Sequence, residues 1–126
     1  MADVPIDGQV IVLTAAKASV PPARLPDLLE RTTAHLSPQV ERYRREYEQI
    51  YEDEHREAFL VEWSHWDEVG VTLELGDREA SAVRRAHEEQ LLRIGRKRDR
   101  EAEFETALEI REAVFFPIVE ATDASR

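Results

Sequence analysis

The sequence predicts an all-α protein, a compact bundle of five to six helices. Apolar side chains recur at helical spacing along most of the 126 residues. Hydrophobic residues make up 42% of the chain and only four residues are glycine, which suits a folded helical core. A chain of this length is expected to form one domain, here residues 1–117, followed by a disordered C-terminal tail over 118–126.

The first predicted helix covers residues 9–18, with Asp7 as its N-cap and the proline pair at 21–22 beyond its end. Within it, the run Val10–Leu13 also fits a short buried strand, so periodicity leaves both assignments open. A second helix opens at Pro26, a residue type that is favoured in the first helical turn.

Ser37 and Pro38 predict a new helix start, with serine as the N-cap and proline at the first helical position. The helix after them has an apolar stripe made of Val40, Tyr43, Tyr47 and Ile50. Residues 51–57 are nearly all polar, so they form either an exposed stretch of a long helix or a break capped by Asp53.

The second half begins with the most apolar segment of the chain, residues 58–69, and the alternating segment 70–76 then has weak strand or turn character. Asp77 is the predicted N-cap of a long helix that continues to residue 94. A last helix is expected to place Phe104, Leu108 and Phe115 on one row. Residues 58–94 together have the outline of a helix–turn–helix unit.

The charge of the chain is strongly one-sided. It has 27 acidic and 17 basic residues, a formal net charge of −10, and all but Lys17 and Lys97 of the basic residues are arginine. Because molar salt screens charge repulsion, this composition favours adaptation to a salt-rich cytoplasm. We expect a cytoplasmic protein without a membrane partner, since the chain contains no signal peptide and no long apolar run.

Aromatic side chains suggest a function in association. Such residues are enriched in protein interfaces, and the chain presents them in the segment 59–66 and in the predicted last helix. The sequence therefore predicts a non-catalytic interaction module that binds a second copy of itself or another protein. The expected interface residues are Phe59, Trp63, Trp66, Phe104, Leu108 and Phe115.

A helix–turn–helix regulator of DNA is the alternative interpretation. Its predicted recognition helix would present Arg78, Arg84, Arg85 and Arg93 to a nucleic acid. Glu79, Glu88 and Glu89 on the same helix would face phosphate, although concentrated salt weakens the phosphate contribution in any case.

A metal-binding helical bundle is the third interpretation. It rests on two Glu-x-x-His pairs, Glu52 with His55 and Glu62 with His65, a spacing that occurs in di-iron bundles. On one continuous helix the two pairs would lie roughly 15 Å apart, too far to share a metal ion. We expect no cofactor and no enzymatic activity, because the sequence has no nucleophile turn, phosphate-binding loop or dinucleotide fingerprint.

Several stretches carry a resemblance to a known family. They are Asp7-Gly8 with Leu13-Thr14-Ala15-Ala16-Lys17, the segment 20–26 (Val-Pro-Pro-Ala-Arg-Leu-Pro), the segment 77–87, and the segment 104–114 (Phe-Glu-Thr-Ala-Leu-Glu-Ile-Arg-Glu-Ala-Val). Together they resemble a family of small acidic proteins of haloarchaea that is classed as a domain of unknown function. The resemblance implies a salt-rich habitat and supplies no catalytic residues.

Overall fold

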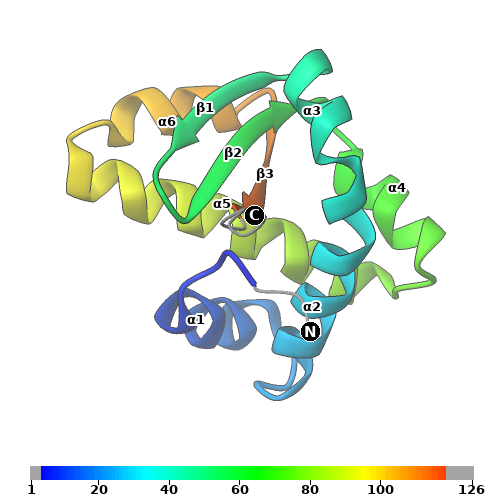
Figure 1. Ribbon diagram of the computed structural model, residues 1–126. Coiled ribbons are helices and arrows are strands. Elements are labelled where there is room, and N and C mark those ends of the chain that lie inside the picture. Colours follow the sequence, from blue (N-terminus) through cyan, green and yellow to red (C-terminus); the bar gives the residue numbers. More distant parts are fainter. Residues whose placement is uncertain (1–3, 119–126) are drawn as a thin grey trace, which may run out of the picture.

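The fold mixes helices with an antiparallel sheet, so the all-α prediction is wrong. A computed structural model describes residues 4–118, and Figure 1 shows its helices arranged around a three-stranded sheet. The elements are, in chain order, α1 (Gly8–Ala18), α2 (Arg24–Leu36), the 3-10 turn η1 (Ser37–Gln39), α3 (Val40–Glu46), β1 (Glu48–Glu52), β2 (Arg56–Val61), α4 (His65–Thr72), α5 (Asp77–Arg98), α6 (Glu101–Leu108) and β3 (Glu112–Pro117).

The sheet has the order β1-β2-β3 with both pairs antiparallel. β1 and β2 form a hairpin whose turn is built by Asp53. Its carboxylate accepts the backbone N–H groups of His55 and Arg56 at 2.8 and 3.0 Å, which is the local bonding that makes aspartate a turn residue. The chain therefore breaks at Asp53, and the break is a hairpin turn between strands.

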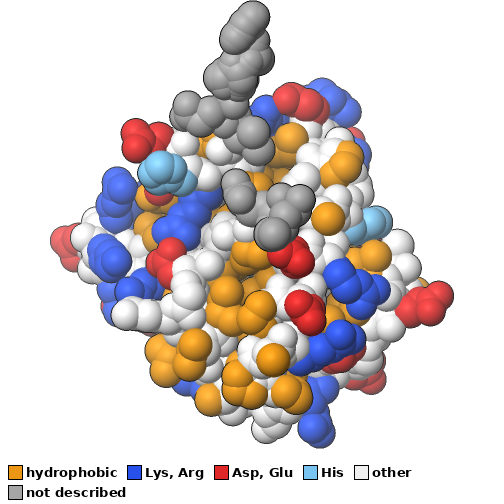
Figure 2. All heavy atoms as spheres, turned by 60° about the horizontal axis from the view of Figure 1, so that its bottom comes forward, with side chains coloured by type: hydrophobic (Ala, Val, Ile, Leu, Met, Phe, Trp, Pro, Cys, Tyr) orange, Lys and Arg blue, Asp and Glu red, His pale blue; other side chains and the backbone are white. Residues whose placement is uncertain are grey.

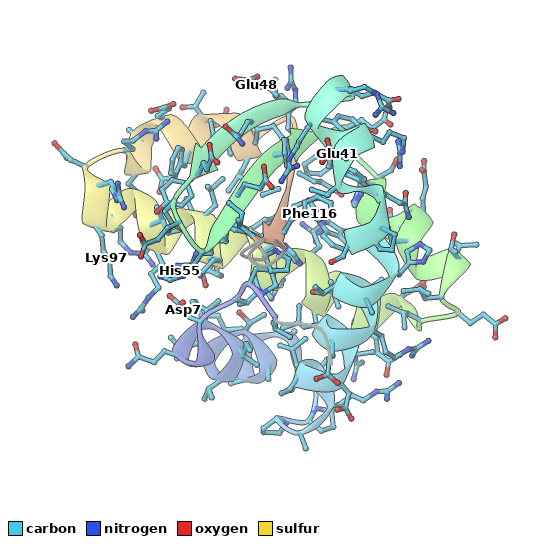
Figure 3. The ribbon with its side chains drawn as sticks, viewed as in Figure 1. Asp7, Glu41, Glu48, His55, Lys97 and Phe116 are labelled. Carbon is cyan, nitrogen blue, oxygen red and sulfur yellow. The ribbon has the colours of Figure 1, made fainter. Side chains whose placement is uncertain are left out.

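Strands β2 and β3 are buried on both faces of the sheet. Phe59 and Phe116 lie on the face that α3 covers, where the ring centroid of Tyr43 is 6.4 and 4.9 Å from theirs. Ala58 and Phe115 pair across β2 and β3 on the opposite face, where α5 packs. Figure 3 labels Phe116 near the centre of the molecule. Strands with two covered faces form continuous apolar runs, and such runs carry no alternation to distinguish them from buried helix.

A buried glutamate pairs with an exposed arginine on the α3 side of the sheet. Glu57 is 1% exposed, and the guanidinium of Arg44 donates to its carboxylate from Nη2 at 2.5 Å and from Nε at 3.2 Å. Gln49 adds a third donor at 3.1 Å. Glu57 thus has the partners that a buried carboxylate needs.

Helix α5 is the centre of the fold. It packs against α1, α2, α4, α6 and β3, and Figure 1 shows it crossing the molecule between α1 and the sheet. The helix continues past the predicted end at residue 94 to Arg98, through Gly95. A side chain at Gly95 would meet Phe104 at 2.9 Å, so this glycine lets α6 approach α5 closely.

The remaining helices confirm one local prediction and correct another. Residues 8–18 are helical, which decides between helix and strand for this segment. Ser37 and Pro38 form the 3-10 turn between α2 and α3 instead of a new N-cap.

The N–H of Ile118 donates to His55 O at 2.8 Å, while the rest of the predicted tail, 119–126, lies outside the described residues. Among residues 4–118, no helix has the length and apolar character to cross a membrane.

Candidate functional site

Two buried histidines and a tryptophan form a cluster of rings where α4 meets α5. The ring of Trp66 lies 4.8 Å from that of His65 and 4.5 Å from that of His87, measured between centroids. All three side chains are buried. Burial lowers the pKa of His87 to about 3, so this imidazole is neutral throughout the physiological range.

Trp66 and His87 of this cluster cover the outer edge of β3. The indole N–H of Trp66 donates to Ala113 O at 3.1 Å, and the backbone N–H of Phe115 donates to Nδ1 of His87 at 3.0 Å. Because Nδ1 accepts a hydrogen bond, the ring hydrogen of His87 belongs on Nε2. Side chains thus pair backbone groups that an edge strand would otherwise leave open.

Glu112 connects the start of β3 to the start of α4. Its buried carboxylate accepts the backbone N–H groups of Ser64 at 3.1 Å and of Trp66 at 2.9 Å. It therefore caps the helix in place of Ser64, whose own side chain makes no capping bond. This contact fixes the direction in which the first turn of α4, with His65, leaves the sheet.

His65 forms a buried pair with Tyr43 of α3, with the phenol oxygen 2.6 Å from Nε2. Burial, with a smaller contribution from the positive charge of Arg42, lowers the pKa of His65 to about 4. Burial also raises the pKa of Tyr43 to about 12. Both groups are therefore neutral near pH 7, and the phenol donates to Nε2. The ring hydrogen then resides on Nδ1, which has no hydrogen-bond partner among the described residues.

The Tyr43–His65 pair borders a groove of about 220 Å³ between α4 and the α2–α3 run. Its lining combines apolar, aromatic and charged side chains. They are His35, Leu36, Gln39, Arg42, Tyr43, Tyr47, Glu62, His65, Glu68, Val69 and Thr72.

The predicted interface residues are mostly part of the core. Phe59, Trp66, Phe104 and Phe115 are each 2% exposed or less, so they are not available to a partner in this fold. Leu108 is partly buried. Trp63 alone of the six is well exposed, at 56%.

The predicted nucleic-acid residues are dispersed along α5. Arg78 and Arg85 are exposed, whereas Arg84 pairs with Glu88 at 3.0 Å and Arg93 donates to Gln9 at 2.7 Å. Helices α4 and α5 do follow one another across a short turn, but residues 58–61 of the predicted unit belong to β2. Between residues 80 and 95 of α5 only Arg85 is exposed, because the helix is the centre of the fold.

The predicted metal pairs lie at opposite ends of β2. Glu52 and His55 flank the hairpin turn, which Figure 3 shows with His55 labelled close to Asp7. Glu62 and His65 lie beyond the other end of the strand. Within residues 4–118, no cluster of three or more His, Cys, Asp or Glu side chains could hold a metal ion.

The family comparison covers almost the whole described chain. The model of a domain of unknown function, DUF8048, matches residues 4–118. The chain belongs to this family. No curated protein and no solved structure gave a significant match. The match confirms the expected relation to a domain of unknown function.

Sequence reasoning missed the Tyr43–His65 pair and the cap by Glu112. Both join residues that are far apart in the chain. Tyr43 and His65 are 22 positions apart, and Trp66 and Glu112 are 46 positions apart. One feature of the sequence does indicate a strand in this region. Glu112, Ala113 and the apolar residues after them end in Pro117, a pattern that fits a strand as well as a helix end.

Proposed function

We propose that this protein is a non-catalytic interaction module that pairs with a second copy of itself through the outward face of α1. The observation that carries the proposal is the lack of charge on this face. Residues 8–23 contain one charged side chain, Lys17, whereas 35% of the whole chain is charged. Gln9, Val12, Leu13 and Ala16 are the exposed residues that form the face.

The apolar members of this face are well exposed. Val12 is 63% and Leu13 58% exposed, while Val10, Thr14 and Ala15 on the other side of the helix are buried. Figure 2 looks onto the end of the molecule that carries α1 and the start of α2, and hydrophobic side chains gather there. Adjoining apolar side chains on a surface this rich in charge favour an interaction site.

The uneven distribution of charge over the surface favours a second copy as the partner. Two chains of net charge −10 repel each other over most of their surfaces, and the α1 face is a place where they can meet without opposing carboxylates. At its margin, Lys17 and Arg85 border the same hollow as Glu88 and Glu89. A rim with both signs of charge can complement itself across a two-fold axis, as an isologous interface requires.

We also propose a haloarchaeal source and a cytoplasmic location. The acidic excess and the preference for arginine over lysine support a salt-rich setting. Concentrated salt strengthens the burial of apolar surface and screens the remaining repulsion, so it would favour pairing through α1.

The test is the molar mass in solution, measured by light scattering after size-exclusion chromatography in molar potassium chloride. The wild-type chain is expected to run as a dimer. Leu13→Glu places a carboxylate in the middle of the face and is expected to weaken the dimer at least about tenfold.

Trp63→Glu is the matched control, since Trp63 is also exposed and was predicted as an interface residue but lies away from α1. It should leave the dimer intact. A monomeric wild type would refute self-association, and a dimer lost in Trp63→Glu but kept in Leu13→Glu would refute the α1 interface.

A further inference from the structure

A hollow of about 340 Å³ lies at the corner where α4 leads into α5, and we call it the α4–α5 hollow. Two small residues, Gly70 of α4 and Ala80 of α5, form its floor. A β-carbon at Gly70 would lie 2.9 Å from that of Ala80, so the two helices are in close contact here. Side chains this small leave the space around the contact open. Helix α1 adds no residue to the lining, so the hollow is separate from the proposed self-association.

The turn after α4 places an apolar wall beside this floor. Leu75 donates its backbone N–H to Gly70 O at 2.8 Å, and Glu74 donates its own to Val71 O at 3.2 Å. These two bonds, with Glu74 in the left-handed region at a φ of 58°, form the Schellman ending of a helix. The chain thus folds back on the last turn of α4, and Leu75 and Val71 line the hollow together. Val71 is 80% exposed, so this wall is open to a partner.

Each helix adds one carboxylate to the hollow. Asp67 lies three residues before Gly70 in α4, and the position of Asp77 relative to Ala80 in α5 is the same. Residues at this spacing share one face of a helix, and both aspartates accordingly line the hollow. Both are exposed, and neither carboxylate has an ion-pair or hydrogen-bond partner among residues 4–118. Their oxygens are therefore free to accept bonds from a partner.

The charge around the α4–α5 hollow is one-sided. Residues 57–77 contain six acidic side chains and no lysine or arginine, although 17 of the 126 residues of the chain are basic. The lining of the hollow has no basic residue, whereas the groove beside α3 includes Arg42. Arg31 and Arg78 lie outside the lining, and the guanidinium of Arg31 donates to Leu73 O at 2.9 Å. A cation from a partner would thus meet carboxylates that no base of the lining neutralises.

We propose that the α4–α5 hollow is a docking site for an arginine side chain on a basic segment of another protein. The methylene stem of the arginine would lie on Val71 and Leu75, since long basic side chains cover apolar surface and keep their charged end among polar groups. Its guanidinium, which has five N–H donors, would bind the carboxylates of Asp67 and Asp77.

The net charge of the chain favours a different protein as this partner. A charge of −10 attracts a basic protein and repels a second copy of the chain. Self-association is proposed at α1, where the face is nearly free of charge. The α4–α5 hollow combines an apolar wall with unpaired carboxylates, so it complements a positively charged segment.

Two capped pentapeptides test the docking site by NMR in molar potassium chloride. One has arginine between two pairs of alanines, and the other has citrulline, a neutral side chain of the same shape. The arginine peptide at millimolar concentration is expected to shift the backbone amide signals of Gly70, Val71 and Ala80, and the citrulline peptide should bind about tenfold more weakly. Molar salt screens long-range attraction to an acidic protein, so close contacts decide the result. Equal binding of the two peptides, or no shift at these amides, would overturn the proposal.

Variants that each remove one charge locate the binding site. Asp67→Asn and Asp77→Asn are each expected to weaken binding of the arginine peptide about threefold, the range of an exposed ion pair. Glu68→Gln and Glu74→Gln are the matched controls, because they remove the same charge from exposed positions of the same segment outside the lining. Affinity should be unchanged in both controls. Equal losses in all four variants would assign the binding to overall charge and refute the site.

A cation placed in the hollow provides a second test. Val71→Lys is expected to abolish peptide binding, whereas Thr72→Lys adds the same charge at the next exposed position, outside the lining, and should retain it. Light scattering separates this proposal from self-association. Asp67→Asn should keep the molar mass of the wild type, and a dimer lost in this variant would show that the hollow binds a second copy and would overturn the proposal. A monomeric wild type that binds the arginine peptide would refute self-association alone.

Discussion

His87 joins α5 to the sheet at a single buried hydrogen bond, from the backbone N–H of Phe115 to Nδ1. Replacing it by leucine fills the space with an apolar side chain of similar size but leaves this N–H buried without an acceptor. We expect His87→Leu to lower the free energy of unfolding by about 1–3 kcal/mol, the usual cost of an unsatisfied buried group. Denaturant unfolding measures the loss, and hydrogen exchange of the Phe115 amide should quicken.

His55→Leu provides the comparison for this variant. His55 lies in the hairpin turn with its side chain 81% exposed, so its replacement should change stability by less than about 0.5 kcal/mol. If the two variants were equally stable, the bond from Phe115 would contribute nothing measurable.

The two buried histidines also predict how stability depends on pH. Burial lowers the pKa of His65 to about 4 and of His87 to about 3, from an ordinary value of 6.5. Between about pH 6 and pH 4 the unfolded chain therefore binds up to two more protons than the folded chain. Stability is complete above this range and falls as the pH decreases through it, by up to about 1.4 kcal/mol per pH unit for each histidine.

Urea unfolding between neutral pH and about pH 5, in molar salt, tests this dependence. Burial raises the pKa of Glu88, which acts in the opposite sense, but only as the pH approaches the range of carboxyl groups. His55→Gln should leave the curve unchanged. A flat curve over this range would mean that the two imidazoles are not buried as described.

At the scale of elements, the approach of α6 to α5 depends on Gly95. A β-carbon there would lie 2.9 Å from Cδ2 of Phe104 and 3.0 Å from the backbone of Glu101. Alanine favours a helix over glycine by about 1 kcal/mol, but the backbone of α6 would have to move. We expect Gly95→Ala to lose about 1–3 kcal/mol of stability in thermal or urea unfolding.

Gly8→Ala is the matched control because a β-carbon at Gly8 meets nothing within 4 Å. This variant is expected to be neutral or slightly stabilising. Should Gly95→Ala be as stable as Gly8→Ala, the contact between α5 and α6 would be looser than described.

The strands show why the fold class could not be read from local pattern. The segments 8–18, 24–36 and 77–98 are helices, close to where periodicity predicts them. β2 and β3 have both faces covered, so their apolar runs lack the alternation of a half-exposed strand. The row predicted on the last helix begins in α6 with Phe104 and Leu108, but its last member, Phe115, lies in β3. Helical and extended backbone are both compatible with such a run until its distant neighbours are known.

The candidate site was less accessible to sequence reasoning than the helices. His65 appeared in a metal pair with Glu62, but its partner in the fold is Tyr43, 22 residues away on α3. Most of the aromatic residues predicted for an interface are buried in the core, where they pack in and around the sheet. Of the six predicted interface residues, Trp63 is the one with a well-exposed side chain. Burial depends on how distant elements pack, and that information is absent from any single segment.

At the scale of the whole molecule, the net charge of −10 predicts a dependence on salt. Screening acts over about 3 Å in molar salt and about 30 Å at ten millimolar, so dilution exposes the carboxylates to one another. We expect the free energy of unfolding to fall when potassium chloride is diluted over this range, as followed by circular dichroism in urea. Salt also strengthens apolar burial, so the charge contribution needs its own control.

The double variant Glu105→Gln with Glu109→Gln supplies that control, since both side chains are exposed. It reduces the negative net charge from −10 to −8 without changing the core. If repulsion causes the salt dependence, the variant should lose less stability on dilution than the wild type. Equal losses would assign the effect to apolar burial, and no loss in either protein would contradict adaptation to salt.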